Sequence, residues 1–392
     1  MARGFFPLDE RLALLPTTYS PFLVEAMVRL GTRLPFAQVA EELSFLFGVS
    51  VSPDTVRRLT EQAGALQVAL EQRELERLEH DAPPEREGPA VQQVSADGAM
   101  VPLLGGHWTE VRTIAIGTVH EQQGEAHASD LSYFSRRCSA DQFIRQATLP
   151  THERGTRRAE TVVAVMDGAS WLQELIDEQC PQAMRILDFP HAVGYLSRVA
   201  QAAFGAGSRE AAVWLDEWAP KLKRDTPEVV VAAIRALPTS SAEAAAAKGV
   251  AIRYLSSRME QLRYAVFQAQ SYPIGSGIVE SAGKLVVEAR LKGSGMHWAP
   301  GNLNPLLALR GRLCSGQWAQ IWAGIWREWR AHVVQQRDDR RGIRQAQRAA
   351  EKAAQSAPAT VSQPKQERAK TIIDGRPTKA HPWKQYHPQS AA

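Results

Sequence analysis

The spacing of apolar residues changes near residue 90, and this change divides the chain into two kinds of structure. Before it, apolar side chains recur every three or four positions, for example through FAQVAEELSFLF (36–47), as in amphipathic helices. After it, short apolar runs such as TVVAVM (161–166) are bounded by polar or turn residues, a pattern typical of strands. The pattern predicts a helical N-terminal region followed by an α/β core.

The N-terminal region contains two expected helices joined by a short turn. The first covers 36–47 and ends at Gly48, and the second begins with Ser52 as its N-cap. Arg57 and Arg58 lie beside the apolar face of the second helix. This spacing fits a helix-turn-helix whose second helix enters a DNA groove, and it also fits an ordinary helical hairpin.

The core follows the order β-β-β-α-β-α-β-α. Three consecutive strands followed by βα units form the strand order of the ribonuclease-H-like fold, a mixed sheet. Parallel βαβ units have their ligand sites at the carboxyl ends of the strands. The expected elements are strands at 90–98, 111–120, 129–137, 161–168 and 183–188, and helices at 140–155, 171–180 and 189–205.

The remaining segments predict three further parts. Residues 208–270 have an all-helical pattern, and residues 271–334 contain a turn, a helix, a glycine-rich exit and more helix. After Gln335 the chain is rich in Arg, Gln and Ala and then in Pro, Gln and Lys, which predicts a frayed helix running into disorder. The expected parts are a helical DNA-binding region (1–85), a first core segment (86–207), a helical insertion (208–270), a last core segment with C-terminal helices (271–334) and a basic tail (335–392).

Three acids stand out by their positions. Asp97 is expected at the end of the first strand, Asp167 at the end of the fourth, and Glu280 in the first turn of a later helix. The two aspartates converge if the strands are neighbours, and Glu280 joins them if residues 208–270 are an insertion that returns the chain to the same edge. Two-metal phosphoryl transfer needs such carboxylates, because they hold two Mg²⁺ ions roughly 3.5–4 Å apart.

Each acid also has a purely structural interpretation. Asp-Gly is a common turn pair, which applies to Asp97-Gly98 and to Asp167-Gly168. Glu280 fits the third position of a helix, where the dipole favours an acid. The joint placement of two aspartates at the expected strand ends favours the metal site.

Asp188 and His191 form a fourth signal, three residues apart where the last strand passes into a helix. This spacing lets the two side chains meet over one turn, as an orienting pair beside the metals with the histidine near a phosphate. The alternative is an aspartate N-cap and a surface histidine. A competing assignment makes Asp188 the second metal ligand and Asp167 a turn residue. We prefer Asp167 because it ends the fourth strand.

The segment after Tyr272 contains candidates for DNA contact. Gly275–Gly277 precede the Glu280 helix, and free amides at a helix start suit a phosphate. Trp298 is suited to stacking on an unpaired base, or equally to anchoring the next helix. The expected DNA-contacting residues here are Lys284, Arg290, Lys292, His297 and Trp298. A helix-packing face is favoured over a base-stacking ladder for the tryptophans that recur at helical spacing, Trp318, Trp322, Trp326 and Trp329.

Length and charge refine this picture. The 392 residues allow two or three domains of roughly 100–150 residues each. The chain carries 46 basic and 42 acidic residues, net +4, but residues 327–392 hold 14 basic and 6 acidic ones, net +8. The rest therefore carries −4. A basic tail on a nearly neutral body suggests a polyanionic partner.

Composition excludes several other classes. A hydrophobic content of 44% excludes a wholly disordered chain. Apolar runs fall short of the ~18 residues of a membrane helix, and acids come too early in MARGFFPLDERL for a secretory signal. The three cysteines are odd in number and far apart, so we expect a reducing, cytoplasmic compartment rather than disulfides or a zinc motif. They are Cys138, Cys180 and Cys314.

Several motifs together resemble the ISKra family of insertion-sequence transposases. They are VSADGAMVPL, GGHWTEVRTIAIG, LSYFSR, VVAVMDGASWLQ, ILDFPHAVGYL, NPLLALR and especially YPIGSGIVESAGKLVVEARLKGSGMHW. The resemblance covers about residues 1–325. It implies a DDE transposase with a ribonuclease-H-like core split by a helical insertion. It also implies Mg²⁺ or Mn²⁺ dependence, binding to terminal inverted repeats, and a multimeric protein–DNA complex.

Carried over by residue, the resemblance places the DDE acids at Asp97, Asp167 and Glu280. Asp188 and His191 match the C/D-x-x-H pair that follows the second acid in related Mutator-type transposases. We therefore expect a cytoplasmic enzyme, nucleoid-associated when bound to DNA, that cleaves element ends and joins the freed 3′-hydroxyl to target DNA. The alternatives are a non-catalytic DNA-binding descendant and another ribonuclease-H-like nuclease. The basic tail is expected to add salt-sensitive affinity.

Overall fold

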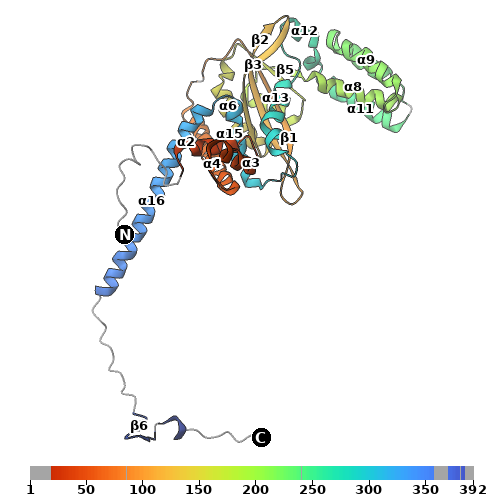
Figure 1. Cartoon of the computed structure of the whole chain (residues 1–392). Helices are drawn as coiled ribbons and strands as arrows, with labels where there is room; N and C mark the ends of the chain where they lie inside the picture. The colour runs from red at the N-terminus through yellow and green to blue at the C-terminus, as the bar shows by residue number, and fades with distance from the viewer. Residues whose placement is uncertain (1–18, 85, 240, 357–369, 380, 385–392) are drawn as a thin grey trace, which may run out of the picture. The chain divides into compact units, whose positions relative to one another are not determined.

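The computed structural model describes residues 19–84, 86–239, 241–356, 370–379 and 381–384. The chain forms two compact units, one ending at Val333 and the other beginning at Val334. The first unit contains a five-stranded sheet with helices on both faces (Figure 1). The fold class is therefore α/β with a mixed sheet, as the hydrophobic pattern predicts.

The sheet has the strand order β3-β2-β1-β4-β5. The first three strands pair antiparallel, and β1, β4 and β5 pair parallel. The observed succession of strands and helices follows the predicted one. The strands are β1 (Val91–Pro102), β2 (Trp108–Gln122), β3 (Glu125–Arg136), β4 (Thr161–Met166) and β5 (Met184–Leu187).

One expectation about β1 is wrong: Asp97 does not end it. The strand continues to Pro102, because residues 98–102 still pair with β2 after the parallel pairing with β4 has ended at Val94. Asp97 therefore lies where β1 leaves β4 and continues only in the antiparallel hairpin. A carboxylate in this position still lies beside the carboxyl end of β4.

Successive side chains along the strands point to opposite faces of the sheet, and each face packs against helices. Val94 and Ala96 face one side with Ile114, where they pack against α5 (Ala140–Gln146) and α7 (Ser170–Gln179). The expected single helix at 140–155 is instead α5 and α6 (Thr148–Glu153), with Pro150, which has no N–H to donate, in the first turn of α6.

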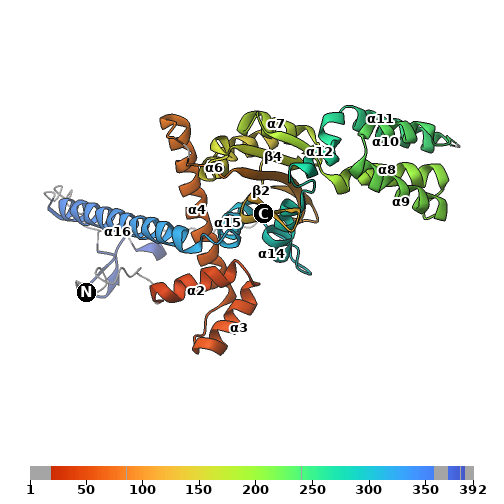
Figure 2. The same ribbon diagram turned by 90° about the horizontal axis from the view of Figure 1, so that it is seen from above.

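The opposite face is covered by two groups of helices. Over β4 and β5 lies α8 (Phe189–Phe204), and over β1–β3 lie the segment 277–291 and α15 (Pro300–Cys314). Figure 2 shows α7 and α14 on opposite sides of the sheet. The helix before α15 consists of α13 (Gly277–Ala282), a π-helical stretch (Gly283–Glu288) and α14 (Ala289–Leu291).

The segment between α8 and α13 is helical, as expected for 208–270. Its helices share a core with α8 built on side chains such as Leu196, Val230 and Leu255, and α8, α9 and α11 lie together on one side of the sheet (Figures 1 and 2). The elements are α9 (Arg209–Arg224), α10 (Pro227–Ala236), α11 (Ala242–Ser256), η2 (Met259–Leu262) and α12 (Tyr264–Ala269).

The N-terminal helices pack with the start of the last long helix. The predicted caps are present: Gly48 has φ +64° after α3, and the Ser52 hydroxyl accepts the Thr55 amide at the start of α4. Trp318, Trp322 and Trp329 are buried in this core, which confirms the packing role of the tryptophan stripe. The helices are α2 (Pro21–Gly31), α3 (Phe36–Phe47), α4 (Pro53–Asp81) and α16 (Trp318–Ser356).

A buried ion-pair network joins α4 to the sheet. Glu71 of α4 pairs with Arg136 of β3 and with Arg312 of α15, and Arg312 also binds Glu153 of α6 at 2.6 Å. Burial alone would raise the pKa of Glu71, but the two guanidinium groups outweigh it and hold that pKa below its ordinary value. The network fixes α4 against three elements of the core.

The second unit begins with the helix expected after residue 335 and adds a short hairpin that the sequence interpretation did not include. Helix α16 continues to Ser356, and β6 (Ile372–Ile373) pairs with β7 (Arg376–Pro377). Asp374 and Gly375 turn this hairpin with φ of +47° and +73°. The expectation of disorder also covers 357–369 and 385–392, which lie outside the described residues. Among the described residues, no helix is both long enough and apolar enough to cross a membrane.

Candidate functional site

The sheet register brings three acids to one edge. Parallel pairing of β1 with β4 ends at Val94 and Ala164. Asp97 and Asp167 each lie three positions after these last paired residues. Pairing of β4 with β5 ends at Met166 and Leu187, so Asp167 and Asp188 come next. We call the three aspartates the acidic edge. Here the ends of adjacent parallel strands bring acids from distant parts of the sequence together.

Asp97 is exposed and lies in a partly desolvated setting. One carboxylate oxygen accepts the Gly98 amide at 2.7 Å. Desolvation by the surrounding protein raises the pKa of Asp97, the Gly98 hydrogen bond opposes that, and the charges of Asp167 and Glu110 raise it further. A bound cation would relieve this repulsion between carboxylates.

Asp167 both turns the chain and remains accessible to ligands. Its Oδ1 accepts the Ala169 amide at 2.9 Å, which fits the turn interpretation. Its carbonyl accepts a hydrogen bond from the Tyr254 hydroxyl, and Arg258 Nη2 donates to the Gly168 carbonyl at 2.9 Å. Helix α11 and the residues after it therefore fasten the loop that carries the second acid.

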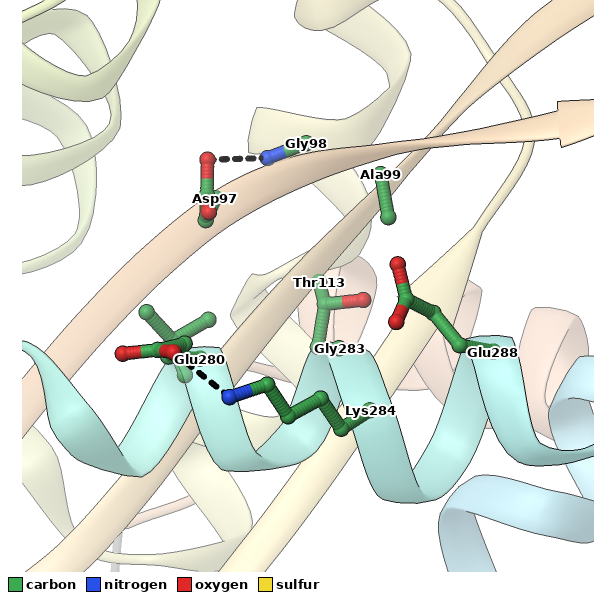
Figure 3. Close-up of a pocket in the computed structure, with 9 residues that line it drawn as sticks. Asp97, Gly98, Ala99, Thr113, Glu280, Gly283, Lys284 and Glu288 are labelled. Atoms are coloured by element: carbon green, nitrogen blue, oxygen red, sulfur yellow. Dashed lines mark hydrogen bonds and ion pairs between the residues drawn. The ribbon is translucent and has the colours of Figure 1, made fainter.

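Glu280 lies in the first turn of α13, as predicted, and its side chain is 68% exposed. Its Oε1 accepts Lys284 Nζ at 2.7 Å, and this hydrogen bond and charge lower the pKa of Glu280. In Figure 3 its carboxylate turns towards Lys284, while that of Asp97 turns towards the Gly98 amide. The two acids line one open hollow of about 130 Å³ with Gly98, Ala99, Thr113, Val279, Gly283, Lys284 and Glu288.

Glu288 is an acid of this hollow that the sequence interpretation missed. It is the last residue of the π-helical stretch, and Lys292 Nζ donates to it at 2.6 Å. Residues eight apart on a regular α-helix lie about 80° apart around the axis. The wider π turn alters this angle, and both Glu280 and Glu288 reach the hollow (Figure 3). The available signal was a second glutamate two turns after the first.

Asp188 is a buried helix cap with both oxygens occupied. Its Oδ2 accepts the His191 amide at 2.9 Å at the start of α8, and its Oδ1 accepts the Ser276 amide at 2.7 Å. The side chain is 7% exposed. The N-cap alternative therefore describes Asp188, which as a second metal ligand would have to bind the ion while both of its oxygens accept amides. His191 is partly exposed, with its ring 5.5 Å from that of Tyr195.

Three hydrogen bonds hold the loop before α13 beside the acidic edge, one of them to Asp188. Phe189 donates to the Ile274 carbonyl at 2.9 Å, Gln93 Nε2 donates to the Gly275 carbonyl at 3.0 Å, and Ser276 donates to Asp188. These bonds return the chain from the insertion to the sheet and place Glu280. The expectation that the amides of 275–277 are all free for a phosphate is wrong for Ser276.

Two of the expected DNA-contacting residues are packing residues instead. Arg290 is 2% exposed, donates to the Gly31 carbonyl at 3.1 Å, and lies over the rings of Phe36 and Trp298. Trp298 is 8% exposed and donates from Nε1 to the Leu291 carbonyl at 3.0 Å. The expectation of DNA contact is wrong for both, because the loop after α14 folds back over the core. The anchoring alternative holds for Trp298.

The other candidates remain at the surface. His297 is exposed, and Lys284 and Lys292 pair with Glu280 and Glu288. On α4, Arg57 pairs with Asp54 at 2.6 Å and with Glu61 at 2.8 Å, and Arg58 pairs with Asp54 at 3.3 Å. DNA contact by either arginine requires phosphates to replace these carboxylates.

Buried Arg310 links the Glu280 helix to the N-terminal helices. Its guanidinium donates to the carbonyls of Leu285 and Val286 in the π-helical stretch and to the Thr32 carbonyl after α2. Together with Arg290, it satisfies main-chain acceptors from both regions. The helix that carries the third acid is therefore held between the sheet and α2.

The acids have the ligand chemistry that Mg²⁺ needs, but their side chains do not form a closed cluster. Among the described residues, no group of three His, Cys, Asp or Glu side chains lies close enough to hold a metal ion. Hard carboxylate oxygens are the right donors, and Asp97, Asp167 and Glu280 are all accessible. Metal binding by all three requires Glu280 to leave Lys284.

Comparison with known proteins does not place the chain in a family. No protein-family model matches it, and a search of curated proteins finds no significant match. Function is therefore inferred from the acids and the elements that hold them.

Proposed function

We propose that this chain is a metal-dependent DDE transposase of ISKra type with a ribonuclease-H-like core. The strand order β3-β2-β1-β4-β5, with an antiparallel half and a parallel half, supports that core. The observation that carries the proposal is the convergence of Asp97 with Asp167 across β1 and β4 and with Glu280 across one hollow. The motif resemblance adds the substrate class, DNA at the ends of an insertion sequence.

In this proposal Asp97, Asp167 and Glu280 hold two Mg²⁺ ions, with Mn²⁺ as a substitute. When bound, the ions would activate a water or a 3′-hydroxyl and stabilise the leaving oxygen of the phosphodiester. Asp97 gives up any proton it holds as a cation binds. Glu280 exchanges Lys284 for the cation, which frees the Lys284 ammonium for a phosphate. Asp188 positions Glu280 through the Ser276 amide.

DNA is the proposed partner, both as terminal inverted repeats and as target, and a homo-oligomer assembles on it. In the second unit, the exposed arginines of α16 supply a sequence-independent attraction to the backbone. They are Arg340, Arg341, Arg344 and Arg348. The cytoplasm, with the nucleoid as the DNA-bound location, is the compartment that this partner requires.

The Glu280–Lys284 ion pair favours a second candidate, a non-catalytic DNA-binding descendant of a transposase. In such a protein the lysine permanently neutralises the third acid. The two candidates differ in one measurement, metal-dependent cleavage of DNA.

The test uses the purified full chain and a DNA fragment that contains the ends of its own element. The transposase cleaves these ends with Mg²⁺ and joins them to a target plasmid. Asp97→Asn, Asp167→Asn and Glu280→Gln each lower the cleavage rate by about a hundredfold or more. Glu110→Gln, which lies near Asp97 without being proposed as a ligand, is the matched control. Cleavage without joining indicates another nuclease, and variants as active as the parent exclude the proposed site.

A further inference from the structure

Two tyrosines and two arginines form a continuous stack beside the acidic edge. The rings of Tyr195 on α8 and Tyr254 on α11 are 4.0 Å apart and nearly parallel, with an interplanar angle of 16°. The Arg198 guanidinium lies 4.1 Å from the Tyr195 ring, and that of Arg258 lies 4.0 Å from the Tyr254 ring. We call these four residues the arginine–tyrosine column.

The column begins at the loop of the second acid. The Tyr254 hydroxyl and Arg258 bond to the carbonyls of Asp167 and Gly168, as described above. The His191 ring lies 5.5 Å from Tyr195 and 6.0 Å from Tyr254. A strand of DNA bound at Asp167 therefore has the column as its immediate neighbour on the insertion side.

The two guanidinium groups of the column have no carboxylate partner within ion-pair distance among the described residues. Among the residues that the structure describes, neither Arg198 nor Arg258 forms an ion pair, and the Arg198 guanidinium makes no hydrogen bond. Arg263 of the same insertion, in contrast, is paired with Glu228 and Glu260. Arg198 is exposed, so its donors are available to an anion from solution.

The stacking determines which part of a nucleotide the column can take. One face of each ring is covered by the other ring and the opposite face by a guanidinium, so neither tyrosine offers a face to a base. The edge of a guanidinium stacked in this way still presents a planar fork of N–H groups, which matches phosphate oxygens. Stacking also orders the long arginine side chain before the ligand arrives.

We propose that Arg198 binds a backbone phosphate of the DNA strand that runs from the acidic edge onto the insertion, and that the Tyr195–Tyr254 stack holds its guanidinium in place. Arg258 adds charge and holds the loop of the second acid. This inference rests on the proposed function, because it takes DNA as the ligand of the acidic edge. It adds a phosphate site outside the acids and outside the residues expected from the sequence.

The test measures binding of the full chain to a fluorescently labelled DNA duplex with a single-stranded 3′ extension, in EDTA. One lost phosphate contact removes ~0.9 from the slope of log K against log salt, an about eightfold loss of affinity at roughly 0.1 M salt. Arg198→Gln is expected to show both changes. Arg209→Gln, which removes the same charge at the outer end of the α8–α9 hairpin, is the control and keeps parental affinity.

Tyrosine variants separate the stacking from the charge. Tyr195→Phe keeps the ring and is expected to bind as the parent does, whereas Tyr195→Leu leaves the guanidinium unsupported and weakens binding severalfold. Circular dichroism of each variant checks that α8 and α11 remain folded. Equal affinities for Arg198→Gln and Arg209→Gln overturn the proposal, as does a Tyr195→Leu variant that is folded and binds as tightly as the parent.

The assay also separates this inference from the proposed function. Binding in EDTA does not depend on catalysis, so a chain that never cleaves DNA but loses affinity in Arg198→Gln keeps the phosphate site and loses the transposase assignment. If the parent cleaves and joins DNA but Arg198→Gln binds DNA as tightly as the parent, the transposase assignment is kept and the phosphate site is lost. A parent chain with no affinity for DNA overturns both.

Discussion

Replacing Glu71 by glutamine is expected to destabilise the first unit strongly. Glu71 is buried and faces Arg136 and Arg312, and it is the acid that pairs with Arg136. Without it, Arg136 becomes an unpaired buried cation, while Arg312 keeps Glu153. Breaking a buried pair by removing one partner costs about 3–5 kcal/mol, because the remaining charge stays desolvated. The free energy of unfolding should fall by an amount in that range.

A second glutamate on the same helix provides the control. Glu79 pairs with Arg145 through two hydrogen bonds of 2.7 Å, but both side chains are exposed. Exposed pairs contribute only ~0.2–1 kcal/mol, so Glu79→Gln should shift the unfolding midpoint little. Urea denaturation followed by tryptophan fluorescence compares the two variants, since several tryptophans pack in the core that α4 contributes to. Equal shifts for Glu71→Gln and Glu79→Gln would refute the reasoning.

The effect of Glu71→Gln should also depend on pH. The folded-state pKa of Glu71 lies below its unfolded value, so its charge stabilises the fold above the unfolded pKa of about 4.3. That contribution is lost as the pH falls through the folded pKa. The stability difference between parent and Glu71→Gln is therefore full at neutral pH and narrows in acid. A difference that widens as the pH falls contradicts the assigned direction.

Three further outcomes follow from the site. Because the pKa of Asp97 is raised, the affinity for Mn²⁺ should increase as the pH rises above the ordinary aspartate pKa. Calorimetry at several pH values should show that Asp97→Asn loses this dependence. A parent protein whose Mn²⁺ affinity does not change with pH would contradict this prediction. Asp188→Ala should lower the free energy of unfolding by ~1 kcal/mol, because a helix cap is lost, and should slow DNA cleavage while Mn²⁺ still binds. If calorimetry shows that the variant no longer binds Mn²⁺, Asp188 is a metal ligand. Trp298→Phe should lower the free energy of unfolding by ~1 kcal/mol, because the indole hydrogen bond is lost, without changing DNA affinity in an anisotropy assay. Weaker DNA binding by this variant would indicate that Trp298 contacts DNA.

Features that depend on a few neighbouring residues were predictable from the sequence. Gly48 and Ser52 act as caps within their own turns, and β4 ends at Met166, directly before Asp167, because the buried run ends there. The hairpin at Asp374-Gly375 has the same kind of local signal, an Asp-Gly pair directly after the apolar Ile372 and Ile373. The convergence of Asp97 with Asp167 required only the correct strand order.

Features that depend on distant partners were not predictable in this way. Arg290 has the composition of a surface residue and is buried because α2, some 260 positions earlier, supplies the Gly31 carbonyl. The second hydrogen bond of Asp188 comes from the Ser276 amide, which lies 88 positions later, after the whole insertion. The end of β1 was misplaced because Asp97-Gly98 resembles a turn while the pairing with β2 continues past it.

The π-helical stretch lies between two contacts of the same helix, that of Glu280 with the hollow and that of Arg290 with the Gly31 carbonyl of α2. A regular helix turns about 100° per residue, and a π turn accommodates roughly one residue more than an α turn. Deleting one residue between Glu280 and Arg290 would therefore rotate the two ends by about 100° relative to each other. Either the glutamate would leave the hollow or the arginine would leave Gly31. The π-helical stretch therefore sets the angle at which Glu280 and Arg290 leave the helix, and a one-residue deletion would break one of these two contacts while keeping both side chains in the sequence.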